Sequence, residues 1–570
     1  MCGIYVVFGD RHYRESFNMN YENIKPRGPD ETIVSDETDK FLVFHRLAIN
    51  GVVNGSQPMT IGNYTLLCNG EIYNYKQLAK KYEYNLKTGS DCEIIIHLYK
   101  LFGIERTLQE LDGEFAFILI DNEGNVVHFA RDPLGVKPLY MRVNKDERNN
   151  IQMLELSSSV SGMSSGSSVS PSVSAILANP QHVIPRVLYT YDMNRCILSS
   201  QTYKSFSYLT YENGNNVRFG KITKNHIYDC LINGVYKRIT NSQRPIGFFL
   251  SGGIDSCSVL SIALDSGLLK SPTDVFTFAF HKNAPDALAA GVMVDWLKKK
   301  YGDDCIKWHL VIDSTENGVS NIPTVIRHLE TYDTTTIRAS TPMYMLSKYI
   351  SEKTDVKVVI SGEGSDELFG GYLYNNYSPN KWAFRAEIIS ALDNLYLYDV
   401  LRADRVTAAC GLEIRPPFLD KNLIDSVLSY KHLQHSSKNS KQILRDILEK
   451  NNVLPNEILH GRKEAFSDAV GLDWQDSVEL YATKYVRDHN DSINKLLYQL
   501  VKNTASKSKK DVQTISKKEI EKSNTELYFT NEFVKLFGYK SMNLLPKLWL
   551  PNQDWVFTGS EPSARALDIY

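Results

Sequence analysis

The spacing of apolar residues changes near Tyr203, and this change constrains the fold more than any other feature of the sequence. Before that point the apolar runs are short and closely spaced, with one helical stretch at 91–102. The runs lie at 4–8, 41–44, 64–68, 115–120 and 126–130. Many strands with few helices are typical of a sheet-rich α+β domain. We therefore predict a first domain built mainly of sheets.

Beyond about residue 203, apolar strands alternate with helical segments. Strands are predicted at 246–250, 275–280, 307–312 and 356–360, with helices from Ser256 and at about 287–300 and 342–350. Such alternation is typical of a parallel sheet with crossover helices. Beyond about residue 380 the chain looks mostly helical. We predict two domains, 2–205 and 206–570, the second an α/β parallel-sheet domain with a largely helical C-terminal part.

A glycine-rich turn follows the first strand of the second domain. The turn reads SGGIDS at 251–256, between an apolar strand and an amphipathic helix. A strand, a glycine turn and a helix point backbone N–H groups at an anion, and pyrophosphate is the natural guest. Asp255 would repel a polyanion unless a cation lies between them, and Mg²⁺ is commonly held by one or two carboxylates together with phosphates.

A second glycine turn follows the predicted strand at 356–360. Its sequence is SGEGSDE at 361–367, and Glu367 stands where a dinucleotide-binding motif would require a third glycine. A Walker A loop is also absent, because the one Gly-Lys pair, at 220–221, lacks the upstream glycine. Three acidic residues on one turn repel each other unless a metal or a proton relieves them. We therefore predict a metal-binding or catalytic role for this turn.

Cys2 is a candidate nucleophile. If Met1 is removed, one residue carries both a thiol and an α-amine, and an amine with a pKa of roughly 7.7 to 8.0 can activate the thiol. Taken alone, Cys2 is equally well explained as a small buried residue at the start of an apolar strand.

Five blocks of the second domain together carry a family resemblance. The turn at 251–256 resembles the pyrophosphate-binding loop of ATP pyrophosphatases, which split ATP into AMP and pyrophosphate while they adenylate a carboxylate. The other blocks are ETYDTTTIRASTPMY at 330–344, SGEGSDELFGGY at 361–372, LRADRVTAACGLEIRPPFLD at 401–420 and KEAFSD at 463–468. In this combination the chain resembles the glutamine-hydrolysing asparagine synthetases.

The resemblance implies roles for single residues of the second domain. Asp255 and Asp366 would hold Mg²⁺, and Lys463 would neutralise charge that develops on the phosphates. Glu363 would position or deprotonate ammonia, or assist adenylation, and Arg338 would pair with a carboxylate of the acceptor aspartate. The implied ATP-binding residues are Leu250, Ser251, Gly252, Gly253, Asp255, Ser256, Phe278, Ser361, Gly362 and Lys463.

In the same family the first domain is a class II glutamine amidotransferase with an N-terminal-nucleophile fold of layered antiparallel sheets. Matching blocks are RGPD at 27–30, HRLAI at 45–49, NGEIYN at 69–74, TGSDCE at 88–93 and RDPLGVKPLY at 131–140. Cys2 would attack the glutamine amide, while the Asn69 amide and the Gly70 N–H would stabilise the oxyanion. The implied glutamine-binding residues are Arg46 for the α-carboxylate, Asp91 for the α-ammonium, and Asn69, Gly70 and Glu71.

The expected reaction makes asparagine from aspartate, with glutamine as nitrogen donor, through β-aspartyl-AMP. Ammonia would travel from Cys2 to the adenylate through an internal, mostly apolar passage. The match departs from the family pattern at 281–286, at 307–310 and over 151–220. These departures concern the segments expected to contact adenine and ribose and the join between the domains.

Three rival functions are weaker. An amidotransferase that makes a phosphoribosylamine or an amino sugar would not need the turn at 251–256. A β-lactam synthetase-like enzyme would have no use for Cys2, Arg46, Asn69 and Asp91. A non-catalytic homologue would not be expected to keep every one of these positions.

Bulk properties exclude other classes. A formal net charge of −2 does not indicate a nucleic-acid partner, and no apolar run is long enough for a membrane span. No secretory signal is visible, so a cytoplasmic location is expected. Eight scattered cysteines predict reduced thiols. The serine-rich stretch at 157–174 is predicted to be a loop or linker, and the lysine-rich stretch at 502–522 a solvated helix face or loop. A homodimer is one option for the oligomeric state.

Overall fold

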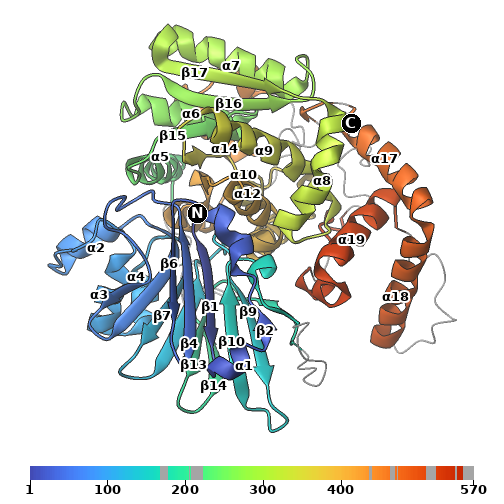
Figure 1. Ribbon diagram of the computed structural model, residues 1–570. Helices are drawn as coiled ribbons and strands as arrows, with labels where there is room; N and C mark the ends of the chain where they lie inside the picture. Colours follow the sequence, from blue (N-terminus) through green and yellow to red (C-terminus); the bar gives the residue numbers. More distant parts are fainter. Residues whose placement is uncertain are drawn as a thin grey trace.

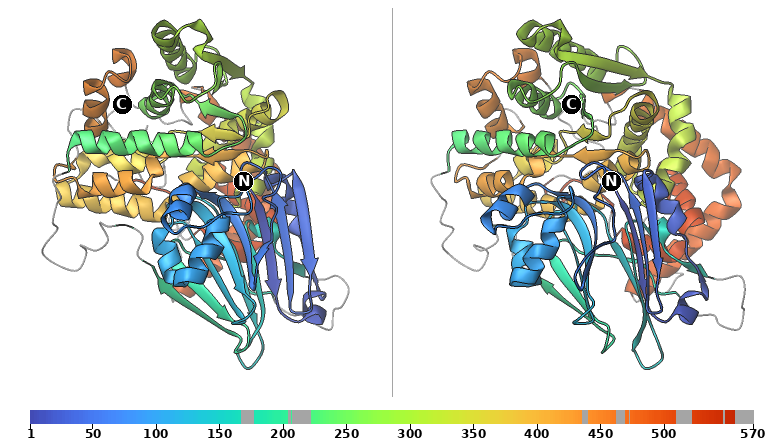
Figure 2. Two further views of the ribbon diagram at one scale, coloured as in Figure 1. Left: turned by 90° about the vertical axis from the view of Figure 1, so that its left-hand side faces the viewer. Right: turned by 60° about the vertical axis from the view of Figure 1, so that its left-hand side comes forward.

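The protein is described by a computed structural model that covers residues 1–166, 177–203, 206, 222–434, 440–461, 469–471, 473–508, 522–545 and 548–555. Two units lie one above the other, with the sheet-rich unit below in Figure 1. The N-terminus lies at their junction in all three views of Figures 1 and 2. Among the helices that the structure describes, none has the length and apolar character needed to span a membrane.

The first unit consists mainly of two six-stranded sheets in which every pairing is antiparallel. One sheet has the order β12-β9-β10-β1-β4-β3, and the other β14-β13-β8-β7-β6-β5. The first sheet contains β1 (Gly3–Phe8), β3 (Glu31–Asp36), β4 (Lys40–Arg46), β9 (Tyr140–Lys145), β10 (Ile151–Ser157) and β12 (Gln181–His182). The second contains β5 (Met59–Ile61), β6 (Tyr64–Ile72), β7 (Gly113–Asp121), β8 (Val126–Arg131), β13 (Val187–Asp192) and β14 (Ile197–Thr202).

The core of this unit lies between the two sheets. Ile4, Val6 and Phe8 of β1 share one cluster with Leu67 of β6 and Ile118 of β7. The residues between them on β1 pack on the opposite face, so the strand is buried on both sides and reads as a continuous apolar run. Helices α2 (Tyr75–Lys81), α3 (Glu93–Phe102) and α4 (Ile104–Glu110) contribute to a second cluster with the other face of β6 and β7. The predicted α+β domain is confirmed.

The second unit contains a five-stranded parallel sheet of order β17-β16-β15-β18-β19. Its strands are β15 (Ile246–Phe249), β16 (Thr273–Ala279), β17 (Ile306–Ile312), β18 (Val358–Ile360) and β19 (Glu413–Arg415). The order reverses at β15, because the chain moves outward to β16 and β17 and then returns to β18 on the other side. Ligands of such sheets bind beyond the carboxyl ends of the strands at this reversal.

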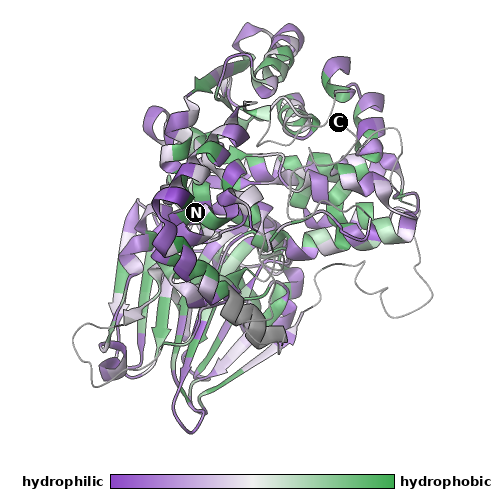
Figure 3. Ribbon diagram, turned by 90° about the vertical axis from the view of Figure 1, so that its right-hand side faces the viewer, coloured by the Kyte–Doolittle hydropathy of each residue, from purple (hydrophilic) through white to green (hydrophobic). Residues whose placement is uncertain are grey.

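Helices surround the sheet and make up most of the C-terminal part, as predicted. The earlier ones are α5 (Lys224–Thr240), α6 (Ile254–Asp265), α7 (Pro285–Tyr301), α8 (Thr315–Leu329) and α9 (Thr334–Lys353). The later ones are α10 (Ser365–Phe369), α11 (Lys381–Asn394), α12 (Asp399–Ala408), α13 (Lys421–Ser429), α14 (Gln442–Lys450), α15 (Asn456–Leu459), α17 (Trp474–Asp488), α18 (Asn490–Ser508) and α19 (Asn524–Phe537). In Figure 3 these helices carry hydrophilic and hydrophobic residues in alternation, as expected for helices with one buried face.

Over 157–166, the part of the serine-rich stretch that the structure describes, the predicted loop is a buried, hydrogen-bonded connection between two strands. Ser157 ends β10, and β11 (Ser165–Gly166) pairs with β2 (Phe17–Asn18). Several of its serines are buried, and the Ser158 hydroxyl accepts a hydrogen bond from the Ile4 N–H at 2.9 Å. Small side chains that bond to the backbone let this segment pack between sheets and helices, although its composition looks unstructured. Residues 167–176 and, in the lysine-rich stretch, 509–521 lie outside the described residues.

Candidate active sites

Cys2 lies at the start of β1, where the two units meet. With Met1 in place its nitrogen is a peptide N–H, which donates to Asn69 Oδ1 at 2.8 Å. The Cys2 thiol lies 3.8 Å from the carbonyl oxygen of Leu47, and Arg27 Nε donates to the Cys2 carbonyl at 3.1 Å. Burial raises the pKa of the Cys2 thiol to about 11. A thiolate at neutral pH therefore requires a base beside it.

Asn69 and Gly70 lie on β6, opposite Ala116 and Phe115 of β7. Asn69 Oδ1 is engaged by Cys2, whereas Asn69 Nδ2 is buried and has no hydrogen-bond partner among the described residues. A buried amide donor without a partner is rare and indicates an acceptor that arrives with a ligand. Gly70 has a φ of 155°, and a Cβ there would lie 2.2 Å from the carbonyl oxygen of Glu114. Only glycine fits at this position.

Arg46 and Asp91 are both buried near this strand. Arg46 ends β4, and its guanidinium lies 3.4 Å from Glu31 Oε2 and also contacts the carbonyl oxygen of Gly51. Asp91 precedes α3 and accepts the Ile72 N–H at 2.5 Å. Burial raises the pKa of Asp91 to about 6. Burial therefore disfavours the charged form of Asp91, and a cationic group of a ligand would stabilise that charged form.

Glu71 connects this site to the second unit. Its carboxylate accepts Asn50 Nδ2 at 2.6 Å and Asn241 Nδ2 at 2.8 Å, and it pairs with Arg415 at 3.0 Å. Asn241 follows α5 and Arg415 ends β19, so two residues of the second unit position a residue beside Asn69 and Gly70. Neither contact was predicted from the sequence: Arg415 lies in the block at 401–420, but nothing in the chain order places it or Asn241 beside Glu71.

Further buried charges join the units. Arg415 also pairs with Glu413 of its own strand at 2.8 Å. Lys137 of the first unit lies 4.0 Å from that Glu413 and 3.9 Å from Glu114 of its own unit. Separately, Arg27 pairs with Asp404 of α12 at 2.8 Å. The carboxylate of Glu330, at the end of α8, accepts hydrogen bonds from Ser159 Oγ, Val160 N and Ser161 N. Buried ion pairs and hydrogen bonds therefore connect the two units across this part of their interface.

Met1 fills an apolar space in the same interface. It is 1% exposed and packs with Phe249, Ala403, Ala408 and Ile414. Phe249 ends β15 and lines the cavity of the second unit. The apolar cluster around Met1 therefore extends from the residue before Cys2 to a residue that lines that cavity.

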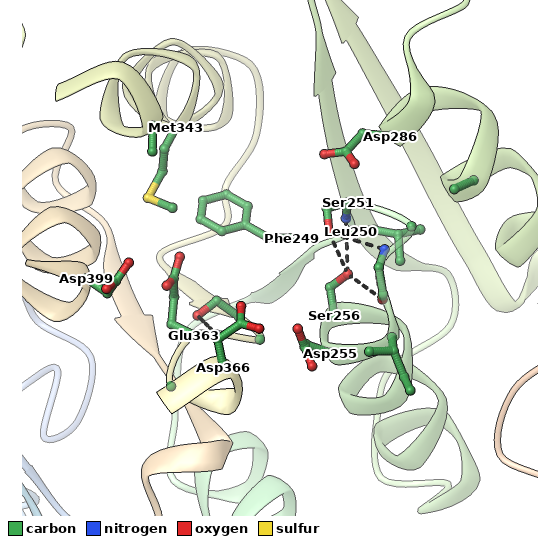
Figure 4. Close-up of a pocket in the computed structure, with 18 of the residues that line it drawn as sticks. Phe249, Leu250, Ser251, Asp255, Ser256, Asp286, Met343, Glu363, Asp366 and Asp399 are labelled. Carbon is green, nitrogen blue, oxygen red and sulfur yellow. Dashed lines mark hydrogen bonds between the residues drawn. The ribbon is translucent and has the colours of Figure 1, made fainter. Parts of the chain in front are cut away.

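A cavity of about 460 Å³ opens beyond the carboxyl ends of β15, β16 and β18. Figure 4 shows the turn after β15 facing the turn after β18 across it. Of the ATP-binding residues implied by the resemblance, all that the structure describes line this cavity, and so does Arg338. They are Leu250, Ser251, Gly252, Gly253, Asp255, Ser256, Phe278, Ser361 and Gly362. Lys463 lies outside the described residues.

The turn after β15 is held by hydroxyl groups. Ser256 Oγ accepts the Ser251 N–H at 3.1 Å and donates to the carbonyl oxygen of Gly253 at 3.3 Å (Figure 4). Gly252 has a φ of 77°, and a Cβ there would lie 2.5 Å from the Cβ of Ala289. Both the positive φ and the short distance to Ala289 require glycine at this position.

Asp255 and Asp366 meet at one cation. Lys441 Nζ lies 2.5 Å from Asp255 Oδ2 and 2.7 Å from Asp366 Oδ1. Asp255 Oδ1 also accepts the hydroxyl of Ser365 at 2.6 Å. Lys441 was not predicted from the sequence, because it precedes α14 and is far in the chain from both aspartates.

Glu363 lies on the same turn as Asp366 and faces the cavity (Figure 4). Arg402 of α12 donates to Glu363 Oε2 at 2.8 Å and pairs with Asp399 at 2.7 Å. Burial raises the pKa of Glu363, although Arg402 opposes this effect. Trp549, near the C-terminus, lines another side of the cavity, and its backbone N–H donates to Asp333 Oδ2 at 2.7 Å. Arg402 was not singled out from the sequence, although it lies in the block at 401–420 that carries the family resemblance.

Comparisons with known proteins agree with this arrangement. A family model described as "Glutamine amidotransferase domain" matches residues 1–184, and one described as "Asparagine synthase" matches 226–388 and 376–527. The chain is 34% identical to the asparagine synthetase [glutamine-hydrolyzing] of Gallus gallus, over all of this chain and 99% of that protein. It is 34% identical to a probable asparagine synthetase [glutamine-hydrolyzing] of Acanthamoeba polyphaga mimivirus over the full length of both, and 33% identical to the Homo sapiens protein over 100% and 99%. The chain therefore belongs to the glutamine-hydrolysing asparagine synthetase family.

Proposed function

We propose that this chain makes asparagine from aspartate and ATP with nitrogen taken from glutamine, releasing glutamate, AMP and pyrophosphate. The proposal is carried by Asn69, which lies beside Cys2 and whose Nδ2 has no hydrogen-bond partner among the described residues, and by the cavity across the interface, which is lined by a glycine turn and carboxylates. The first site suits an amide that is attacked by a thiol. The second site, the cavity of the second unit, suits a nucleotide together with a carboxylic acid substrate.

In the first site, Cys2 would attack the side-chain amide of glutamine after Met1 has been removed. With Met1 in place, burial raises the pKa of the Cys2 thiol to about 11, so the thiol needs a base. The α-amine that Met1 removal creates would be that base and would take the thiol proton. Asn69 Nδ2 would donate to the oxyanion together with the Gly70 N–H, contacts of a kind that lower the barrier by about 3 kcal/mol each. Arg46 and Asp91 would bind the α-carboxylate and α-ammonium of the substrate. Ammonia and a glutamyl thioester are the products of this step.

Ammonia would then cross the interface through the space next to Cys2. Removal of Met1 empties a volume bordered by Phe249, Ala403, Ala408 and Ile414, and Phe249 also lines the second cavity. An apolar path disfavours protonation, because ammonium is poorly solvated there. This supports the transfer of ammonia within the molecule.

In the second site, the turn at Ser251, Gly252 and Gly253 would hold the phosphates of ATP. Asp255 and Asp366 fit a magnesium ion, because their oxygen atoms already converge on one cation, the Lys441 ammonium. When bound, Mg²⁺ would offset charge on the pyrophosphate leaving group.

The carboxylate of aspartate would attack the α-phosphorus to give β-aspartyl-AMP. Glu363 would position or deprotonate the ammonia that reaches this intermediate, or assist adenylation, with its orientation set by Arg402. Arg338 lines the cavity and would bind a carboxylate of aspartate. Lys463 keeps its predicted role toward the phosphates. A domain boundary at 205/206, a cytoplasmic location and a homodimer also stay predictions.

The decisive experiment incubates purified protein with glutamine, aspartate, ATP and Mg²⁺ and measures asparagine and AMP. Formation of ADP instead of AMP would refute adenylation. A Cys2→Ala variant is expected to lose glutamine-dependent synthesis and to keep ammonia-dependent synthesis. Loss of both activities in a folded variant would refute the division of labour between the two sites.

A further inference from the structure

The ammonium of Lys441 occupies the point where the predicted metal ligands converge. Its Nζ lies 2.5 Å from Asp255 and 2.7 Å from Asp366, both within ion-pair distance. The Lys441 side chain is 1% exposed, whereas those of Asp255 and Asp366 are 18% and 20% exposed. The cation thus lies deeper than the two anions, and the carboxylates stay open to the cavity.

Local structure directs the Lys441 side chain to this point. Lys441 precedes α14 with φ 55° and ψ 35°, a left-handed conformation that non-glycine residues adopt rarely. Its stem passes over Gly371, where a Cβ would lie 2.1 Å from Lys441 Cε and 1.9 Å from Asp366 Oδ1. A side chain at 371 would therefore displace both partners of the ion pair. The left-handed conformation of Lys441 and the glycine at 371 thus both support the contact of Lys441 with Asp366.

The charges explain why a cation is needed there before any ligand arrives. Asp255 and Asp366 come from turns after different strands, and their carboxylates share one small region. Two carboxylates this close repel each other unless a positive charge lies between them. Lys441 supplies that charge from within the chain.

Building on the proposed function, we propose that Lys441 is an internal counter-ion that holds Asp255 and Asp366 in place and keeps free Mg²⁺ out until ATP is present. A lysine ammonium and a divalent ion need the same oxygen atoms. Without nucleotide, Mg²⁺ would have to displace a buried ammonium or lie beside it, and like charges repel. With nucleotide, the phosphates add negative charge that both cations can share. Metal binding therefore depends on ATP.

Mg²⁺ binding to the wild-type protein tests this by calorimetry, with and without an ATP analogue that carries a non-hydrolysable α,β bridge. We expect the Mg²⁺ affinity to rise at least tenfold with the analogue, since its phosphates offset the ammonium charge. Equal Mg²⁺ affinity with and without the analogue would overturn the proposal. No variant is needed for this measurement, so it does not depend on the folding of a mutant.

Lys441→Met removes the charge and keeps most of the side-chain volume. We expect a lower Tm than wild type without Mg²⁺, and nucleotide-free Mg²⁺ binding at least tenfold tighter than in wild type. The control Lys450→Met changes an exposed lysine of the same helix and should bind Mg²⁺ as wild type does. Unchanged Mg²⁺ affinity in Lys441→Met would refute the role of Lys441.

A double variant separates this inference from the proposed function. Adding Asp366→Asn to Lys441→Met should abolish the gained Mg²⁺ binding, and binding that persists would place the metal elsewhere and overturn the inference. All these measurements are made without aspartate or glutamine. If the Mg²⁺-binding results are as expected but the protein makes no asparagine, the proposed function is refuted and the inference about Lys441 stands.

Discussion

Replacement of Arg415 by methionine should destabilise the protein by leaving buried carboxylates without their cation. Arg415 is 0% exposed and contacts Glu413 at 2.8 Å, Glu71 at 3.0 Å and the carbonyl oxygens of Arg238 and Asn241 at 2.9 and 2.8 Å. Removing one partner of a buried ion pair typically costs about 3 to 5 kcal/mol. With an unfolding entropy of about 2.1 cal/mol/K per residue, a 570-residue chain that unfolds as one unit would lose about 2.5 to 4 °C in Tm.

The pH dependence of this loss has a defined sign. Burial already raises the pKa of Glu71 well above its usual range, and Arg415 opposes that rise. Without Arg415 the pKa of Glu71 would rise further above its value in the unfolded chain, so the folded protein would bind a proton at Glu71 more tightly than wild type does. Stability must then fall as the pH rises above the unfolded pKa, so the deficit should be larger at pH 8 than at pH 6.

Scanning calorimetry of wild type, Arg415→Met and Arg415→Met with Glu71→Gln at both pH values measures the effect. The double variant should recover part of the lost Tm, because it removes one of the stranded charges. Arg415→Lys keeps the charge and serves as a control for the volume change. A wild-type Tm for Arg415→Met at both pH values would refute the view that this network stabilises the interface.

Three further predictions concern the two sites. Asn69→Ala should lower glutaminase kcat by about 10²- to 10³-fold and leave ammonia-dependent asparagine synthesis unchanged, as assayed with each nitrogen source; an unchanged kcat would remove Asn69 from the oxyanion site. Burial raises the pKa of Asp91 to about 6, and only its charged form can pair with an α-ammonium. Glutamine affinity should therefore fall about tenfold between pH 6.5 and pH 5. A glutamine KM that does not change over this pH range would contradict the role of Asp91. Gly252→Ala should abolish ATP binding, measured by calorimetry, because a Cβ would lie 2.5 Å from the Cβ of Ala289, while glutaminase activity at Cys2 persists; wild-type ATP affinity would show that the turn does not approach the phosphates.

Local sequence was enough to predict much of the fold and of the second cavity. The turn with Ser251, Gly252 and Ser256 could be placed because a strand, two glycines and a helix follow one another within a few residues. Lys441 could not, since its position depends on a left-handed residue and on Gly371 from another segment. Arg415 beside Glu71 was equally hidden, because nothing in the order of residues indicates which distant strands end at the same place.

The serine-rich stretch shows a different limit. Composition at 157–174 suggested a loop or linker, because serine and glycine have no apolar periodicity. In the folded chain, Ser159 donates to a carboxylate of the second unit and Ser158 accepts from β1. Small polar residues can fill a polar interface, and their hydrogen-bond partners are visible only when both sides are present.

The ion pairs across the interface bear on whether the two units could exist as separate polypeptides. Splitting the chain would leave Arg27 and Glu71 on one product and Asp404 and Arg415 on the other, each facing water. Reassociation would have to remove that water again and would also depend on concentration, whereas a covalent connection supplies an effective concentration of roughly millimolar. Arg27 also contacts the Cys2 carbonyl, so a separated first unit would keep this contact but lose Asp404, the ion-pair partner that holds Arg27 beside the proposed nucleophile. Genetic fusion is thus part of how this catalyst keeps its glutaminase intact.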